Sequence, residues 1–255
     1  MAHNLAQLRE LLTQYGPIDF LFIDGTSTNP SQLKELAWKL QPNIVVTRGA
    51  MKTPEQKTPD QSMPGPWEAC YTLGTQWHFK PTNETYKSGT QLIEMLIEIR
   101  AKGGNFLLNV GPTPEGEIPV EQKRRIRELA LWLFINGEAI YNIRPWHVIR
   151  EGNIWFTKAK DADTVYAIIT HTDWPRGKRK TFTLKNVRAT DKTQIEILGQ
   201  SGRILEYQPK VKPKTTWKQD ENGLHIAAVR AQRIYNDSKW PNPIVVKITH
   251  ARPGK

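Results

Sequence analysis

The first 146 residues alternate between segments of helical periodicity and short apolar runs. A helical segment over residues 5–15 ends at Gly16-Pro17, and an apolar run over residues 20–23 follows it. The same alternation continues, with apolar runs at 44–46 and 106–110. Continuous apolar runs of this length are typical of parallel strands that are covered on both faces. The pattern therefore predicts an α/β region of parallel strands joined by crossover helices.

After residue 146 the pattern changes to short β-type runs that turn residues separate. These runs fall at residues 154–157, 165–170, 180–184, 194–198, 223–229 and 244–248. Runs of this kind are typical of an antiparallel β-sandwich. We expect a domain boundary near residue 148, with one domain over residues 1–147 and a second over 148–255. The charge supports this division, because the whole formal excess of +11 lies in the second region.

The first region offers about four candidate strands, and this number leaves two folds open. A closed (β/α)8 barrel needs eight strands. An open doubly wound sheet needs fewer, but the chain shows no glycine-rich phosphate loop. The region is therefore either a small open sheet or part of a barrel whose front half is absent from this sequence.

Composition excludes several classes of function. A single cysteine, Cys70, rules out an internal disulfide and a cysteine-based zinc site, and we expect it to be a buried structural thiol. The histidines show no ligand spacing, so no metal is expected. No apolar run is long enough to span a membrane, and no signal peptide is visible. The basic second region carries no nucleic-acid-binding motif, so we expect a solvated surface and no nucleic-acid partner.

Charged residues stand where a barrel enzyme places its working groups, at the carboxyl ends of strands. Asp24 ends the first apolar run, Arg48 ends the second, and Glu55 and Glu68 lie on the polar segment after Arg48. Two carboxylates at one site suit glycoside hydrolysis, in which one is the nucleophile and the other the acid and base. Arg48 would keep the nucleophile ionised, and the apolar neighbour Trp67 would raise the pKa of Glu68.

Each of these residues also has a purely structural interpretation, which spacing alone does not exclude. In that interpretation Asp24 belongs only to a turn, Arg48 to a structural ion pair, and Glu55 to a helix start after Pro54. Trp67 and Trp77 fit a sugar-stacking role and a core position equally well. The pattern therefore leaves the site open between catalysis and packing.

Three stretches resemble the α-L-fucosidases of glycoside hydrolase family 29. They are YGPIDFLFIDG at residues 15–25, GPWEACYT at 65–72, and KGGNFLLNVGPTPEG at 102–116, which NGEAIY follows at 136–141. The resemblance implies the carboxyl-terminal half of a (β/α)8, TIM-like barrel followed by an antiparallel β-sandwich. It also implies a retaining hydrolase that removes terminal α-L-fucose from glycans without a cofactor, in a bacterial periplasm or outside the cell.

In this resemblance Asp24 matches the nucleophile and Arg48 an arginine of the sugar pocket. Glu55 and Glu68 are the two candidates for the acid/base; position favours Glu55 slightly, and Trp67 beside Glu68 favours the other. Trp67 and Trp77 are the candidate sugar-binding aromatic residues. The resemblance thus assigns one nucleophile and leaves two candidates for the proton donor.

The chain departs from the family pattern at two motifs and in its extent. It has Val46-Thr47 before the pocket arginine, where the family usually has an asparagine, and Trp77-His78-Phe79 replaces the usual Trp-Gly-Tyr. The family's front half has no counterpart here. We therefore expect a truncated or split enzyme that a second chain completes, or alternatively a non-catalytic glycan-binding or interaction protein derived from one.

Overall fold

The computed structural model describes residues 2–25, 30–171, 173–175, 177–200, 212–230 and 242–254. The chain divides into two compact units. Unit 1 comprises residues 1–71 and 104–108, and unit 2 comprises residues 72–103 and 109–255. None of the described helices is long and apolar enough to cross a membrane.

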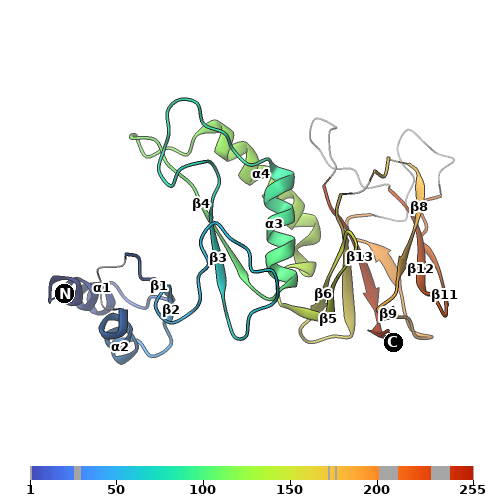
Figure 1. The fold of residues 1–255 in the computed structure, drawn as a ribbon, viewed down its shortest axis with the longest axis horizontal. Helices are drawn as coiled ribbons and strands as arrows, with labels where there is room; N and C mark the ends of the chain where they lie inside the picture. Colours follow the sequence, from blue (N-terminus) through green and yellow to red (C-terminus); the bar gives the residue numbers. More distant parts are fainter. Residues whose placement is uncertain are drawn as a thin grey trace. The chain divides into compact units, whose positions relative to one another are not determined.

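Unit 1 begins with two helix–strand repeats (Figure 1). In chain order they are α1 (Ala2–Gln14), β1 (Phe20–Phe22), α2 (Pro30–Leu40) and β2 (Val45–Thr47). The two strands are parallel, with Phe22 opposite Thr47, and the two helices contact each other. Leu8, Leu33 and Val46 belong to one buried apolar cluster that joins both helices to the strand pair. The predicted alternation of helices and parallel strands is confirmed here.

The polar segment after β2 extends this strand pair toward two further strands, β3 (Glu68–Thr72) and β4 (Asn105–Asn109). Isolated parallel bridges join Thr47 to Met51 and Lys52 to Trp67. Strands β3 and β4 form a pair of their own, bracketed by bonds from the Asn105 N–H to the Trp67 carbonyl and from the Leu73 N–H to the Asn109 carbonyl. From the first bond to the second, the residue numbers rise along both strands, so β3 and β4 are parallel.

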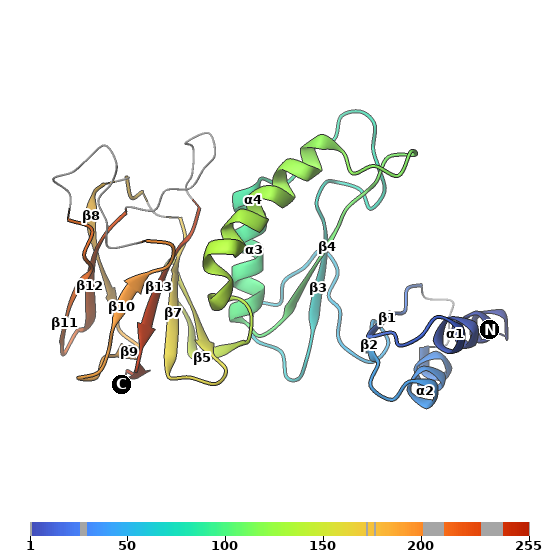
Figure 2. The same cartoon turned by 180° about the vertical axis from the view of Figure 1, so that it is seen from behind.

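Unit 2 contains two helices that pack side by side, α3 (Gly89–Ala101) and α4 (Val120–Asn136) (Figure 2). Helix α3 starts in a capping box, in which the Ser88 hydroxyl accepts from the Gln91 N–H and the Gln91 side chain accepts from the Ser88 N–H. The same helix contacts strands β5 (Ile143–Glu151) and β6 (Ile154–Ala159).

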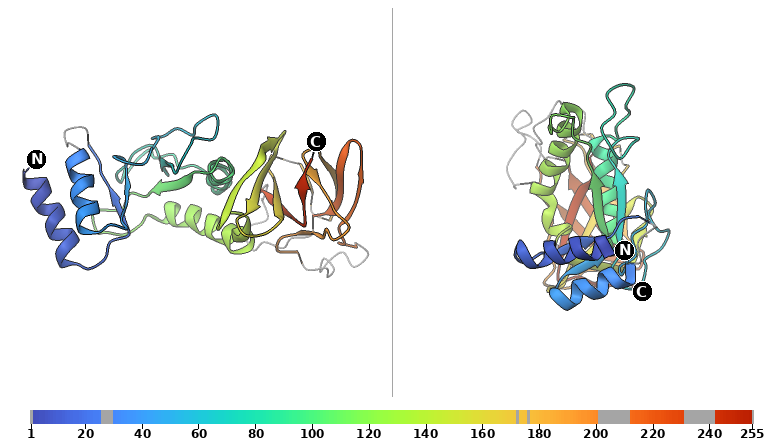
Figure 3. Two further views of the ribbon diagram at one scale, coloured as in Figure 1. Left: turned by 90° about the horizontal axis from the view of Figure 1, so that it is seen from below. Right: turned by 90° about the vertical axis from the view of Figure 1, so that its left-hand side faces the viewer.

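From β5 onward, unit 2 is a sandwich of two main sheets (Figure 3), with a further two-stranded sheet, β14-β9. Its other strands are β7 (Thr164–Ile169), β8 (Arg179–Leu184), β9 (Val187–Arg188), β10 (Ile195–Ile197), β11 (Thr216–Asp220), β12 (Gly223–Val229), β13 (Ile244–Thr249) and β14 (Arg252–Pro253). One antiparallel sheet has the order β10-β13-β7-β6-β5 and the other β11-β12-β8. Phe156 and Phe182, one from each sheet, lie in a single buried cluster, which confirms the predicted sandwich.

Strand β5 runs through residue 148, where the sequence suggests a domain boundary. It pairs with β6 at both of its ends, over residues 143–145 and 150–151, with a register shift between Pro145 and Arg150. The compact units divide the chain elsewhere, and they join α3 and α4 to the sandwich. The domain boundary near residue 148 stays a prediction.

Candidate active site

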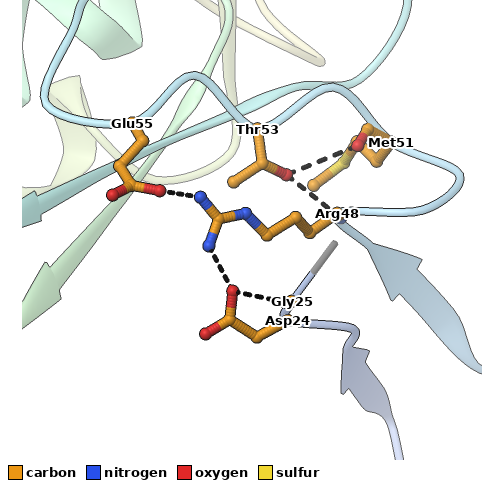
Figure 4. A network of polar contacts seen from close by, with 6 residues as sticks. All are labelled: Asp24, Gly25, Arg48, Met51, Thr53 and Glu55. Atoms are coloured by element: carbon orange, nitrogen blue, oxygen red, sulfur yellow. Dashed lines mark hydrogen bonds and ion pairs between the residues drawn. The ribbon is translucent and has the colours of Figure 1, made fainter. Parts of the chain in front are cut away.

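Asp24 lies two residues and Arg48 one residue beyond the ends of two neighbouring parallel strands, β1 and β2 (Figure 4). Because Phe22 is opposite Thr47, the residues that follow emerge at the same edge of the sheet. Asp24 Oδ1 lies 2.6 Å from Arg48 Nη1 and also accepts the Gly25 N–H at 2.9 Å. The Asp24 side chain is 72% exposed. A carboxylate that is fixed by a cation and open on its other side is placed to react with a ligand.

Arg48 is held in an unusual backbone conformation, with φ at +48°. Residues other than glycine rarely adopt positive φ, and those that do gather at functional sites. The Arg48 N–H donates to the Thr53 hydroxyl at 3.1 Å, and that hydroxyl donates to the Met51 carbonyl. The guanidinium carbon lies 5.4 Å from the centre of the Phe22 ring. Thr53 and Phe22 therefore orient Arg48, and no motif in the sequence singles them out for this role.

Glu55 reaches the same guanidinium from the other side. Its carboxylate forms an ion pair with Arg48 Nη2, while Asp24 contacts Nη1 (Figure 4). The backbone around Glu55 is fixed to strand β3, because the Cys70 N–H donates to the Pro54 carbonyl and the Gln56 N–H donates to the Cys70 carbonyl. Glu55 thus lies on a segment that pairs with the sheet, and Arg48 bridges the two carboxylates.

Glu68 lies in the same unit but is buried on strand β3, with an exposed fraction of 6%. Burial raises its pKa, because a low-dielectric environment disfavours the charged form. Its Oε1 atom has no hydrogen-bond partner in the described part of the chain. Glu68 therefore has the raised pKa expected of an acid, whereas Glu55 has the contact with the Asp24–Arg48 pair.

Cys70 is buried, as predicted, and its environment links the charged residues around it. Burial raises the pKa of the thiol, Arg48 lowers it, and Glu68 and Asp24 raise it further. All three charges therefore lie near enough to act on one thiol, which places Glu68 in the neighbourhood of the Asp24–Arg48 pair.

The two candidate sugar-binding aromatic residues differ in exposure. Trp67 is 1% exposed and packs against Gly104, where an added Cβ would lie 2.4 Å from the indole ring. It is a core residue in this structure. Trp77 is 39% exposed and belongs to unit 2. A sugar contact of either residue stays a prediction.

Among the described residues, no group of three His, Cys, Asp or Glu side chains is arranged to hold a metal ion.

The buried carboxyl of Glu68 predicts a measurable dependence of stability on pH. A raised folded-state pKa means that the native state holds its proton more tightly, so stability falls as pH rises from about 4.5 through the folded-state value. We expect Glu68→Gln to remove this fall, so that its melting temperature exceeds that of the wild type increasingly as pH rises from about 4.5 through the folded-state pKa of Glu68. Thermal unfolding at a series of pH values measures the difference.

Glu35→Gln is the matched control for this measurement, because Glu35 is exposed on helix α2 of the same unit. Its melting temperature should follow that of the wild type at every pH. A constant difference between Glu68→Gln and the wild type across this range would contradict the burial argument.

Two family models match the chain. The model described as Alpha-L-fucosidase matches residues 1–138, and the model described as Alpha-L-fucosidase C-terminal domain matches residues 149–249. The first covers more than half of the chain and includes Asp24, Arg48, Glu55 and Glu68. The second covers most of the sandwich.

Curated relatives include the plasma alpha-L-fucosidase of Rattus norvegicus, 30% identical over 81% of this chain and 50% of the relative. The tissue alpha-L-fucosidase of Mus musculus is 31% identical over 80% of this chain and 49% of the relative. The chain spans about half the length of the curated relatives it matches.

Solved structures share the fold. Alpha-L-fucosidase isoenzyme 1 from Paenibacillus thiaminolyticus gives a TM-score of 0.75 at 22% identity, covering 97% of this chain and 61% of that one. A Bacteroides thetaiotaomicron enzyme of glycoside hydrolase family 29, trapped as a covalent intermediate in complex with 2-fluoro-fucosyl fluoride, gives 0.70 at 17% identity, with 98% and 61% covered.

Proposed function

This chain belongs to the α-L-fucosidase family, glycoside hydrolase family 29, and on that premise we propose that it carries the reacting carboxylates of a retaining hydrolase. Its substrates are glycans and glycosides that end in α-L-fucose. The observation that supports this most directly is the contact of Asp24 and Glu55 with the two terminal nitrogens of one guanidinium. Two carboxylates held so close together suit the short separation that retention requires.

In the first step the Asp24 carboxylate attacks the anomeric carbon of fucose. The bond from that carbon to the glycosidic oxygen breaks, and Glu55 protonates the departing oxygen. The product is a covalent ester between fucose and Asp24. The exposed Asp24 oxygen that Arg48 does not contact is the atom in position to attack.

In the second step a water molecule attacks the same carbon while Glu55, now ionised, accepts its proton. The ester bond breaks and restores the Asp24 carboxylate, so two inversions leave the product in its original α configuration. Arg48 contacts both side chains, so it aligns them and stabilises Asp24 while it is ionised in the first step and Glu55 while it is ionised in the second. Proton transfer and displacement by side chains account for both steps, so the reaction calls for no cofactor.

We further propose that catalysis requires more barrel strands than the described residues provide, supplied by a longer polypeptide or by a second chain. The described part of the α/β region holds four of the eight strands that a closed barrel needs. Large apolar side chains are exposed on it: Phe20 at 43%, Trp38 at 40%, Val45 at 48%, and Phe134 of helix α4 at 90%. Exposed apolar side chains on strands and helices are the surface that further barrel elements would cover.

Hydrolysis of 4-nitrophenyl α-L-fucoside tests this function. The chain is assayed alone and co-expressed with the polypeptide encoded directly upstream, a sample that we call the assembled enzyme. We expect nitrophenol release by the assembled enzyme, and NMR should show α-L-fucose as the first product. Binding of L-fucose without turnover in both samples would instead support the non-catalytic glycan-binding alternative, and β-L-fucose as the first product would exclude retention.

A further inference from the structure

Unit 2 contains a cavity of about 300 Å³ between helix α3, the strands β5 and β6, and the residues that follow β7. Its size is at the lower end of the range for small-molecule sites, which suits a ligand of one sugar ring. Glu94, Arg150, Trp155 and His171 line it, and none of them belongs to the group around Asp24. The proposed hydrolytic steps leave this cavity without a role.

The acidic wall of the cavity is formed by α3. The Glu94 side chain is 18% exposed, and its Oε2 lies 3.3 Å from Nε2 of His171. Burial raises the pKa of Glu94, and His171 lowers it. Glu98, one turn further along the helix, pairs with Lys102 at 2.6 Å. Glu94 is therefore the carboxylate of this wall that is neither balanced by a lysine nor fully exposed, and it offers acceptor oxygens to a ligand.

Donors come from the other walls. Lys87 lines the cavity and donates to the Thr72 carbonyl at 2.7 Å, which orients an ammonium group that has further protons to give. Lys87 is partly buried, and burial lowers its pKa. Arg150 stacks on the Trp155 indole, with 4.7 Å between the guanidinium carbon and the ring centre. His171 adds a ring nitrogen at the rim.

We propose that this cavity is a second binding site, and that it takes one neutral sugar residue. Each sugar hydroxyl both donates and accepts, so adjacent hydroxyls can donate to Glu94 while accepting from Lys87 or His171. The charges of the lining groups oppose one another: an anion would meet Glu94 and Glu98, and a cation would meet Lys87 and Arg150. A neutral polyol uses both kinds of group and suffers neither repulsion.

An NMR titration that follows the Trp155 indole N–H tests the site. The signal is assigned by its loss in Trp155→Phe, and the probes are L-fucose, D-galactose and N-acetyl-D-glucosamine. We expect a saturable shift with at least one of them, and an affinity about tenfold lower in Glu94→Ala, because a charged acceptor is lost. D-glucuronate and D-glucosamine serve as the anionic and cationic comparators, and we expect both to bind more weakly.

Three controls separate the outcomes. Glu117→Ala removes an exposed acid of the same unit that does not line the cavity, and it should leave the affinity unchanged. Asp24→Asn should also leave it unchanged, so that the result does not depend on the proposed hydrolysis. Glu94→Gln keeps the side-chain shape and should still weaken binding if Glu94→Ala fails to fold. No saturable shift with any neutral sugar, tighter binding of a charged comparator, or equal affinity in the folded Glu94 variants would overturn the proposal.

Discussion

Replacement of Asp24 by asparagine is expected to lower fucoside hydrolysis by the assembled enzyme roughly a thousandfold or more, because an amide cannot form the glycosyl ester. The substitution keeps the shape of the side chain and its position two residues after β1. Asparagine also retains an oxygen that can accept from Arg48 Nη1, so the surroundings should change little. Initial rates with 4-nitrophenyl α-L-fucoside measure the loss.

Asp19→Asn is the matched control. Asp19 lies just before the same strand, its side chain is exposed, and it is not part of the contacts around Arg48. Its activity should remain near that of the wild type. Retained activity in Asp24→Asn would exclude Asp24 as the nucleophile.

A covalent trap gives independent evidence for the same atom. With 2-fluoro-fucosyl fluoride, the proposed reaction breaks the bond from the anomeric carbon to fluorine and forms an ester with Asp24, releasing fluoride. Mass spectrometry of the digested protein should find the added sugar on the peptide that contains Asp24. Label on a peptide that contains Glu55 or Glu68 would identify that residue as the nucleophile in place of Asp24.

The positions of Asp24 and Arg48 could be predicted from sequence because they follow from strand ends. Each comes at most two residues after a short apolar run, and parallel strands bring such ends to one edge. The register that places Phe22 opposite Thr47 satisfies this expectation. The family resemblance then assigned the chemistry, which spacing alone left open between catalysis and an ion pair.

The position of Glu55 could not be predicted in the same way. Residues 48–66 are polar and have no regular periodicity, so their pairing with β3 leaves no trace in the pattern. The bonds from Pro54 and Gln56 to Cys70 that fix Glu55 join residues far apart in the chain. Trp67 shows a similar limit, because the sequence left its indole open between a sugar-stacking role and a core position, and only the structure shows that it is buried.

Strand β11 shows why an edge strand of the sandwich was not predicted. All five of its residues, Thr216–Asp220, are exposed, so no alternation of apolar and polar positions marks it. Only its pairing with β12 makes it a strand. The neighbouring β12, with both faces largely covered, has the apolar run that predicted it correctly.

The proton donor can be identified by how the rate depends on the leaving group. If Glu55 is the acid, Glu55→Gln should slow the first step about 10²- to 10⁴-fold for a disaccharide, whose sugar leaving group needs a proton. Fluoride needs little protonation in order to leave, so the first step with fucosyl fluoride should be nearly unaffected. Glu68→Gln should leave the ratio between the two substrates at the wild-type value, because Glu68 is buried and lacks a contact with the Arg48 guanidinium among the described residues.

The opposite result would assign the proton to Glu68. Its raised pKa keeps a carboxyl protonated at a pH where an ordinary glutamate is ionised, which suits the first step. However, the same group must then accept a proton from water at the site of the ester, and an exposed fraction of 6% places Glu68 away from solvent. Glu55 contacts the Arg48 guanidinium that Asp24 also contacts, so it can serve in both steps. The leaving-group ratios of the two variants therefore decide whether the proton donor is Glu55, which lies close to Asp24, or Glu68, which has the raised pKa.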